Sequence, residues 1–258
     1  MPETPEMTLN AALFEWLLRM GDNTLILGHR VSEWCGHAPV LEEDIALANT
    51  ALDLIGQTQL WLGLAGEVEG KGRSADNLAY LRDASAFRNV LLVERPNGDF
   101  GQTLMRQFLF DAWHLDMLKA LRQSTDGRVA DIAEKAQKEV AYHLERSADL
   151  VIRLGDGSQE SHRRLQAALD DHWSYTGELF VGDEADEQVA KAGIAPAAET
   201  LQGSWSNTVG EVLQAATLTA PESSFSHKGG KRGIHTEHLG YILADMQFLQ
   251  RAYPGATW

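Results

Sequence analysis

Cysteine is almost absent from this sequence of 258 residues, in which Cys35 is the single example. One cysteine cannot form an intramolecular disulfide, and a chain of this length can bury a core large enough to fold without one. The cysteine usage therefore favours a reducing compartment, and we expect a cytoplasmic protein.

Positive charge and long apolar runs are also scarce. The chain has 37 acidic and 22 basic residues, a net charge of −15, which repels phosphate backbones and argues against nucleic-acid binding. No apolar run approaches the ~20 residues of a membrane-spanning helix, and residues 1–7 lack the basic start of a secretory signal. Glycine-rich nucleotide-binding motifs are missing too. We expect a chain that binds neither nucleic acid nor membrane.

Strand-like alternation is absent, whereas apolar residues recur at spacings of three and four along most of the chain. This periodicity predicts an all-α fold. The expected helical stretches are residues 8–36, 42–68, 76–93, 100–123, 128–154, 158–180, 197–217 and 236–252, and the first of them is expected to be bent or interrupted at Gly21–Asn23. An acidic loop at 182–187 and an irregular segment at 221–233 separate the later stretches. We expect a single domain, 1–258, with a central bundle at about 8–154 and additional helices at about 158–258.

Four of these stretches carry a carboxylate on a face that we expect to point inward, namely Glu33, Asp53, Asp111 and Glu139. A ferritin-like di-iron bundle takes one carboxylate from each of two helices and a Glu-x-x-His pair from each of the other two. Here Gly56 stands where the first pair needs an imidazole, and His143 follows Glu139 one residue too late. The pattern predicts a ferritin-like bundle that has lost its iron ligands.

Three interpretations of this polar layer are open. A di-metal centre with an irregular ligand set would need about four carboxylates and two histidines to meet in space. A mononuclear site would use the intact Asp111-x-x-His114 pair. The interpretation that we favour is a metal-free network that includes Gln57, because unpaired buried charges are costly. Candidate counter-charges are Arg30, Arg106 and Lys138.

Other candidate sites are weaker. Cys35 lies in a segment expected to be packed helix without an oriented base, so we expect no catalytic nucleophile there. His235 and His238 open the last helical stretch, where capping and packing are expected in place of metal binding. The basic, glycine-rich segment 228–232 is expected to be a flexible solvated loop, and contact with a phosphate-bearing ligand or an acidic partner is the alternative.

Three blocks of the chain resemble the C subunits of bacterial ring 1,2-phenylacetyl-CoA epoxidases. They are residues 27–39 (LGHRVSEWCGHAP), 51–57 (ALDLIGQ) and 233–258, which begins GIHTEHLGY and ends YPGATW. The blocks lie at both ends of the chain with the expected spacing, and the resemblance covers essentially its whole length.

This resemblance implies a ferritin-like component of a multicomponent oxygenase. In that family a sister chain carries the di-iron centre and binds phenylacetyl-CoA, and the component that this chain resembles is a non-catalytic scaffold bound to it. A further small subunit and an NADPH-dependent reductase with flavin and iron–sulfur groups complete the system. We therefore expect no catalytic residue, metal or cofactor in this chain, and a cytoplasmic hetero-oligomer that acts in phenylacetate catabolism.

The contact with the catalytic di-iron subunit is expected to use an apolar face of the early helices, which Trp16, Trp34 and Trp61 could supply. Alone, the chain should self-associate or be less stable. Two other functions remain open: an active di-metal oxidase or hydroxylase, and a free-standing helical protein that binds a ligand.

Overall fold

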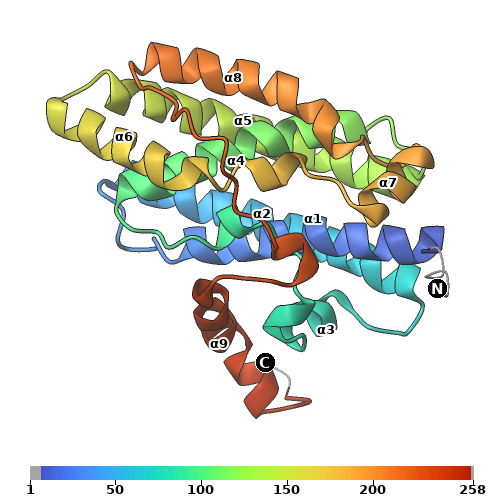
Figure 1. Ribbon diagram of the computed structural model, residues 1–258. Helices are drawn as coiled ribbons and strands as arrows, with labels where there is room; N and C mark the ends of the chain where they lie inside the picture. Colours follow the sequence, from blue (N-terminus) through green and yellow to red (C-terminus); the bar gives the residue numbers. More distant parts are fainter. Residues whose placement is uncertain (1–6, 257–258) are drawn as a thin grey trace.

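Four long helices form the centre of the protein (Figure 1). They are α1 (Leu9–Ser32), α2 (Leu41–Glu69), α4 (Phe100–Leu121) and α5 (Gly127–Gly155). Helix α1 packs along α2 and α4 along α5, and a contact between α2 and α5 joins the two pairs. The computed structural model describes residues 7–256, which contain no strand. The predicted all-α, ferritin-like bundle is confirmed.

Helix α1 is continuous through Gly21–Asn23, so the interruption that was the alternative to a bend at these residues is absent. A Cβ atom added at Gly21 would lie 2.4 Å from Leu62 Cδ2, and one added at Gly28 would lie 3.1 Å from Ile55 Cδ1. The two glycines are separated by two helical turns and share a face. They therefore allow α2 to approach closely, and Gly21 is a packing position, not a break.

The segment between α2 and α4 is less helical than predicted. The expected helix at 76–93 is only α3 (Ala75–Tyr80), followed by two 3₁₀ turns, Ala84–Ala86 and Leu91–Glu94. Side chains from distant parts of the chain hold its backbone: Asp22 accepts a hydrogen bond from the Arg88 amide at 2.8 Å, and Asn23 accepts one from the Val90 amide at 2.8 Å. These external acceptors replace the hydrogen bonds that a continuous helix would supply.

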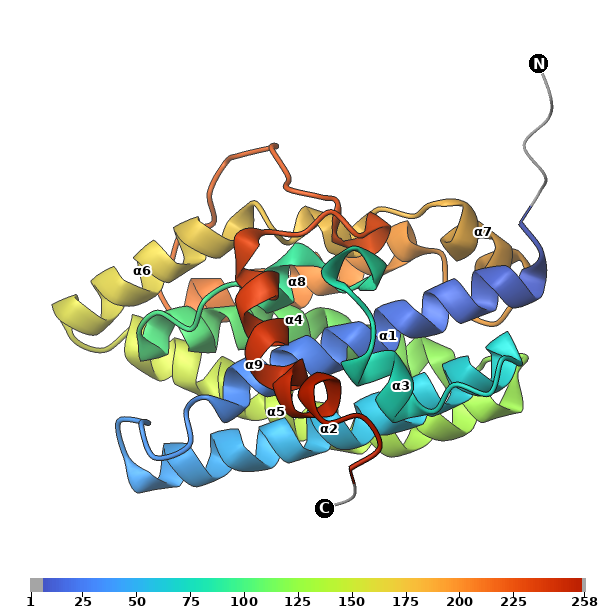
Figure 2. The same cartoon turned by 90° about the horizontal axis from the view of Figure 1, so that it is seen from below.

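The C-terminal half adds helices to the outside of the bundle. They are α6 (Gln159–Trp173), α7 (Glu184–Lys191), α8 (Gln202–Ala215) and α9 (Glu237–Ala252). Helices α6 and α8 lie on the α4–α5 side, α7 contacts α1, and α9 contacts α3 and α1 (Figures 1 and 2). Two of the predicted stretches end or begin with 3₁₀ turns, at Gly177–Phe180 and Ala198–Leu201.

The prediction of an acidic loop at 182–187 was also wrong, because most of this segment belongs to α7. Asp183 caps this helix: its carboxylate accepts hydrogen bonds from the amides of Ala185 and Asp186. Acidic side chains in the first turn further stabilise the positive end of a helix. Among the helices that the structure describes, none has an apolar stretch long enough to cross a membrane.

Candidate functional site

The polar layer predicted from the sequence forms largely between α2 and α5. His143 Nε2 lies 2.9 Å from Asp53 Oδ2, and Gln57 Nε2 donates a hydrogen bond to Glu139 Oε2 at 2.9 Å. His143 is buried, whereas the Asp53 side chain is 37% exposed. The layer therefore opens toward solvent at Asp53, and its two pairs run antiparallel across the helix interface.

Asp111 of α4 extends the layer into the fully buried interior. Its two carboxylate oxygens accept hydrogen bonds from Gln107 Nε2 at 2.6 Å and from Ser147 Oγ at 3.0 Å. Burial raises the pKa of Asp111 to about 6, although nearby His143 and the two hydrogen bonds favour its charged form. Both carboxylate oxygens of Asp111 therefore accept hydrogen bonds from neutral side chains of the protein.

His114 completes the predicted Asp-x-x-His pair but makes no polar contact. Neither ring nitrogen has a hydrogen-bond partner within the described residues. The ring packs against Phe110 and Trp113, with centroid separations of 5.1 and 6.2 Å. Burial lowers its pKa to about 3, and the charge of His143 adds to this effect. His114 is therefore a neutral ring in an aromatic cluster.

Glu33 does not belong to the layer, which corrects the prediction for the first helix. It follows the end of α1 on the exposed surface, where it accepts hydrogen bonds from Arg30 Nη1 at 3.1 Å and Asn97 Nδ2 at 2.8 Å. Helix α1 contributes a hydroxyl near the layer, because Thr24 Oγ1 lies 2.8 Å from Oγ1 of Thr58, the neighbour of Gln57 on α2.

The predicted counter-charges also lie elsewhere. Lys138 is exposed, Arg30 binds the Glu94 carbonyl oxygen, and Arg106 donates to the side-chain oxygen of Asn97 at 2.8 Å. Burial, together with the neighbouring positive charge of Arg30, lowers the pKa of Arg106 to about 9. The positive charges that act on Asp111 are those of His143 and Arg146.

The side chains present do not fit a di-iron centre. Residues 7–256 include no group of three or more His, Cys, Asp and Glu side chains arranged to hold a metal ion. Gly56 has no side chain, and a Cβ added there would meet no atom within 4 Å. A buried dinuclear site needs carboxylates and imidazoles that converge on the metal ions. Here each carboxylate of the layer instead pairs with a side chain of the protein.

The remaining candidates have different outcomes. Cys35 is exposed in the turn after α1, which corrects the expectation of packed helix. His235 has the packing role that was predicted, since Nδ1 lies 2.9 Å from Glu94 Oε2 and Nε2 lies 3.0 Å from the Phe87 carbonyl oxygen. Burial opposes a charged ring, but Glu94 outweighs this effect and the pKa of His235 is raised. His238 lies half-buried in the first turn of α9.

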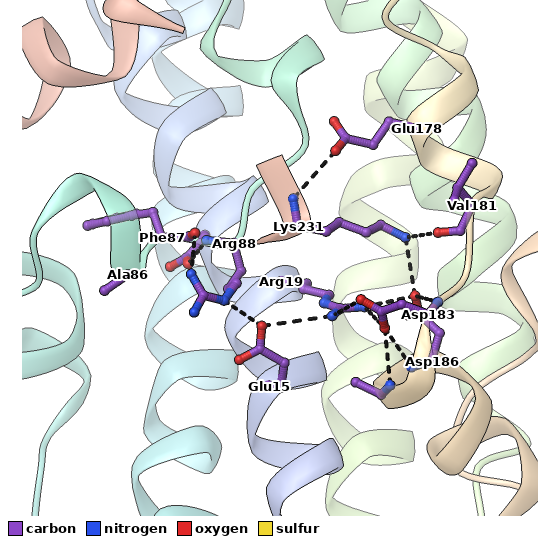
Figure 3. Close-up of polar contacts among 12 residues, drawn as sticks. Glu15, Arg19, Ala86, Phe87, Arg88, Glu178, Val181, Asp183, Asp186 and Lys231 are labelled. Atoms are coloured by element: carbon purple, nitrogen blue, oxygen red, sulfur yellow. Dashed lines mark hydrogen bonds and ion pairs between the residues drawn. The ribbon is translucent and has the colours of Figure 1, made fainter. Parts of the chain in front are cut away.

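The segment 228–232 is not the solvated loop that was predicted. The buried Glu178 carboxylate accepts a hydrogen bond from the Gly229 amide at 2.8 Å. Lys231 Nζ donates to the Val181 carbonyl oxygen at 2.9 Å (Figure 3). Lys231 also lies 3.5 Å from Asp186, and its pKa is lowered because burial opposes its charge. The segment is fixed against the bundle by these bonds.

A second charged cluster, which the sequence reasoning missed, joins α1 to α7. Arg19 Nη2 lies 2.7 Å from Asp183 Oδ2, and Arg19 Nη1 lies 2.8 Å from Asp186 Oδ2 (Figure 3). The Glu15 carboxylate forms ion pairs with both Arg19 and Arg88. Burial opposes ionisation of Asp183, but the hydrogen bonds and charge of Arg19 lower its pKa overall. The Asp-x-x-Asp capping pattern at 183–186 was the available signal for α7, but nothing local pointed to Arg19.

The predicted tryptophan contact surface is part of the core. Trp16 and Trp61 are buried and pack edge to face, with ring centroids 6.2 Å apart. Trp34 is half-buried and donates a hydrogen bond from Nε1 to Thr103 Oγ1 at 2.9 Å. These rings cannot supply an external apolar face.

Solvent instead meets a different apolar row, which we call the α2 seam. It consists of Leu41, Ile45, Leu52 and Ile55. Leu41 is 71% exposed and Leu52 is 70% exposed. Spacings of four, seven and three residues place the row on one face of α2, as in a helix that packs against another helix. Tyr142, which precedes His143 on α5, is also exposed.

The fold and the layer define the class: an all-α, ferritin-like bundle with a polar layer between α2, α4 and α5. Residues 2–258 match the family model described as phenylacetic acid catabolic protein, and the chain belongs to this family. It is 46% identical over 246 residues to the C subunit of 1,2-phenylacetyl-CoA epoxidase of Escherichia coli strain K12. That alignment covers 95% of this chain and 99% of the relative. The resemblance found in the sequence is confirmed.

Proposed function

We propose that this chain is the non-catalytic structural component of a phenylacetyl-CoA epoxidase, and that it binds and supports a catalytic di-iron subunit. It would act in phenylacetate catabolism without a metal or cofactor of its own. The near full-length similarity to a relative named as the C subunit of this enzyme supports the assignment to the complex.

The observation that carries the non-catalytic role is how the carboxylates of the layer are bonded. Asp53 pairs with His143, Glu139 accepts from Gln57, and Asp111 accepts from two neutral side chains. In this network each carboxylate has a partner within the chain, so no cation is needed to pair it. An active di-metal oxidase with irregular ligands would require these pairs to separate and rearrange.

Metal content tests this part of the proposal. Protein expressed in iron-replete medium should contain well below one iron per chain by elemental analysis. The variant Asp53→Asn should lower stability by about 1 kcal/mol, because a charge-assisted hydrogen bond to His143 is weakened. It should leave the turnover of the assembled complex largely unchanged. Two irons per chain, or lost turnover in a folded and assembled variant, would favour the di-metal oxidase.

The partner surface is proposed to be the α2 seam. Its large aliphatic side chains are exposed in the isolated chain, and obligate interfaces have apolar centres that commonly bury more than about 2,000 Å². We expect the catalytic di-iron subunit to cover this row, with the smaller subunit and the NADPH-dependent reductase bound to the assembled pair.

Co-expression with the catalytic subunit tests the surface. Leu52→Asp should prevent co-purification, whereas Phe225→Asp, a matched change of an exposed apolar residue outside the seam, should not. The mixture of both wild-type subunits and reductase should oxidise phenylacetyl-CoA. Full activity of the catalytic subunit in the absence of this chain would refute the scaffold role, and a monodisperse monomer that ignores the partner would favour a free-standing ligand-binding protein.

A further inference from the structure

The last helix, α9, presents an outward face that is complementary to itself. Helix α9 lies on the outside of the bundle, at the bottom of Figure 1 and in front of the other helices in Figure 2. At 100° per residue, six exposed residues share this face. They are Glu237, Gly240, Tyr241, Ala244, Phe248 and Arg251.

This face combines projecting aromatic rings with an open groove. Tyr241 and Phe248 are 66% and 61% exposed. A groove of about 530 Å³ runs between α9 and the turn that contains Asp83, and Gly240 and Ala244 line it. A Cβ atom added at Gly240 would meet nothing within 4 Å, so the helix surface has a hole there beside a knob at Phe248.

We propose that a second copy of this chain docks here, through antiparallel pairing of the two α9 helices about a two-fold axis at Ala244. In such a pair, each residue before Ala244 lies across from the residue equally far after Ala244 in the other copy. Gly240 and Phe248 are each four positions from Ala244, so each ring enters the hole at the other copy's glycine. The small side chain at the crossing point allows the helices to approach closely.

The charges on the same face support a second copy over an unrelated helix. Glu237 and Arg251 are each seven positions from Ala244, so two opposite-charge pairs form at the ends of the antiparallel contact. Arg251 Nη2 is held at the groove by the Arg82 carbonyl oxygen at 2.8 Å and Asp83 Oδ1 at 3.0 Å, yet the side chain is 42% exposed. Its guanidinium is therefore positioned before association, which reduces the ordering cost of binding.

This contact is separate from the α2 seam and does not depend on the proposed function. One helix and its groove form a small interface, so we expect a weak dimer with a dissociation constant on the order of 10 µM. Two copies joined through α9 would leave both α2 seams free for other partners.

Charge reversal tests the pairing in the full-length chain. Sedimentation velocity over about 1–100 µM should show the wild-type protein passing from monomer to dimer. Glu237→Arg and Arg251→Glu should each weaken association at least tenfold, because each places like charges opposite one another. The double variant should recover it, although Arg251→Glu also removes the bond to Asp83. A wild-type monomer throughout, single variants that dimerise normally, or a double variant without recovery would each overturn the pairing.

Site-specific cross-linking provides an independent readout. In a Cys35→Ser background, Ala244→Cys places two thiols at the two-fold axis and should form a disulfide dimer under mild oxidation. Ala167→Cys is the matched control, since Ala167 is an exposed alanine on α6. We expect cross-linking at 244 at least tenfold faster than at 167. Equal rates would overturn the proposed axis, and circular dichroism of each variant verifies that it remains folded.

Discussion

Replacing Asp111 with asparagine should stabilise the protein at neutral pH and have little effect in acid. The Asp111 side chain is fully buried, and desolvation raises its pKa from 3.8 to about 6. A shift of this size corresponds to about 3 kcal/mol, since one pKa unit is worth 1.36 kcal/mol. Asparagine has the same shape, and it can accept from Gln107 and donate to the Ser147 hydroxyl, so the local hydrogen bonds survive.

The sign follows from proton linkage. Between pH 3.8 and about 6 the unfolded chain has released the proton of Asp111, while the folded chain still holds it. Raising the pH through this window therefore costs the wild-type protein stability, and Asp111→Asn removes that cost. The expected gain for the variant is near zero at pH 4 and about 2–3 kcal/mol at pH 7.5, equivalent to about 5–10 °C in Tm.

Urea and thermal unfolding of wild type and variant at matched pH values measure this difference. Subtracting the two curves cancels groups common to both proteins, including the histidines. Asp131→Asn, on the exposed face of α5, controls for the loss of one negative charge. A variant that is less stable than the wild type at pH 7.5 would refute the reasoning, because the ionised carboxylate would then be stabilised, for example by a bound cation.

Substitutions at Arg19, at His235 and at two glycines of α2 have equally definite expected outcomes. Arg19→Ala should lower the free energy of unfolding by about 3–5 kcal/mol, because Asp183 and Asp186 lose the buried guanidinium that they share. Arg153→Ala, which removes an exposed ion pair with Asp149, should cost less than about 1 kcal/mol. Denaturant titration measures both differences. His235→Gln should destabilise the protein more at pH 5.5 than at pH 8.5, since the contribution of a histidine with a raised pKa is lost as the pH rises; a difference independent of pH would contradict this. Gly56→Ala should stabilise the protein by about 0.5–1 kcal/mol, because an added Cβ meets no atom within 4 Å. Gly66→Ala should destabilise the protein, since its Cβ would lie 2.1 Å from the Arg73 carbonyl oxygen. Equal Tm values for the two variants would contradict the packing around these glycines.

Local sequence was sufficient for the long helices. The predicted stretches at 42–68, 100–123 and 128–154 agree with α2, α4 and α5 to within two residues at each end, because apolar periodicity and capping residues act within a few turns. The sequence also predicted that no imidazole lies three residues after Asp53 or Glu139, where Gly56 and Tyr142 stand, since helix geometry fixes which residues share a face. The resemblance to the family at both ends of the chain supported the ferritin-like fold and added the expectation of partner subunits.

The interior network could be predicted only in part. Asp53, Gln57, Glu139 and His143 do meet, as their shared face indicated, but no local signal showed which donor each carboxylate would find. The prediction for Glu33 failed because α1 ends at Ser32, one residue before Glu33, so this side chain lies at the exposed C-terminal end of the helix.

By itself, the sequence determined the helical class, the extent of α2, α4 and α5 and the absence of an imidazole at Gly56, because each depends on residues within a few turns of one another. Only the tertiary structure decided that the Trp16 and Trp61 rings fill the core, that Lys231 is held by Glu178 and Asp186, and that the exposed apolar row lies on α2. Burial and ion pairing depend on which surfaces meet. The bond between Arg19 and Asp183 joins residues 164 positions apart, a distance over which helical periodicity carries no information.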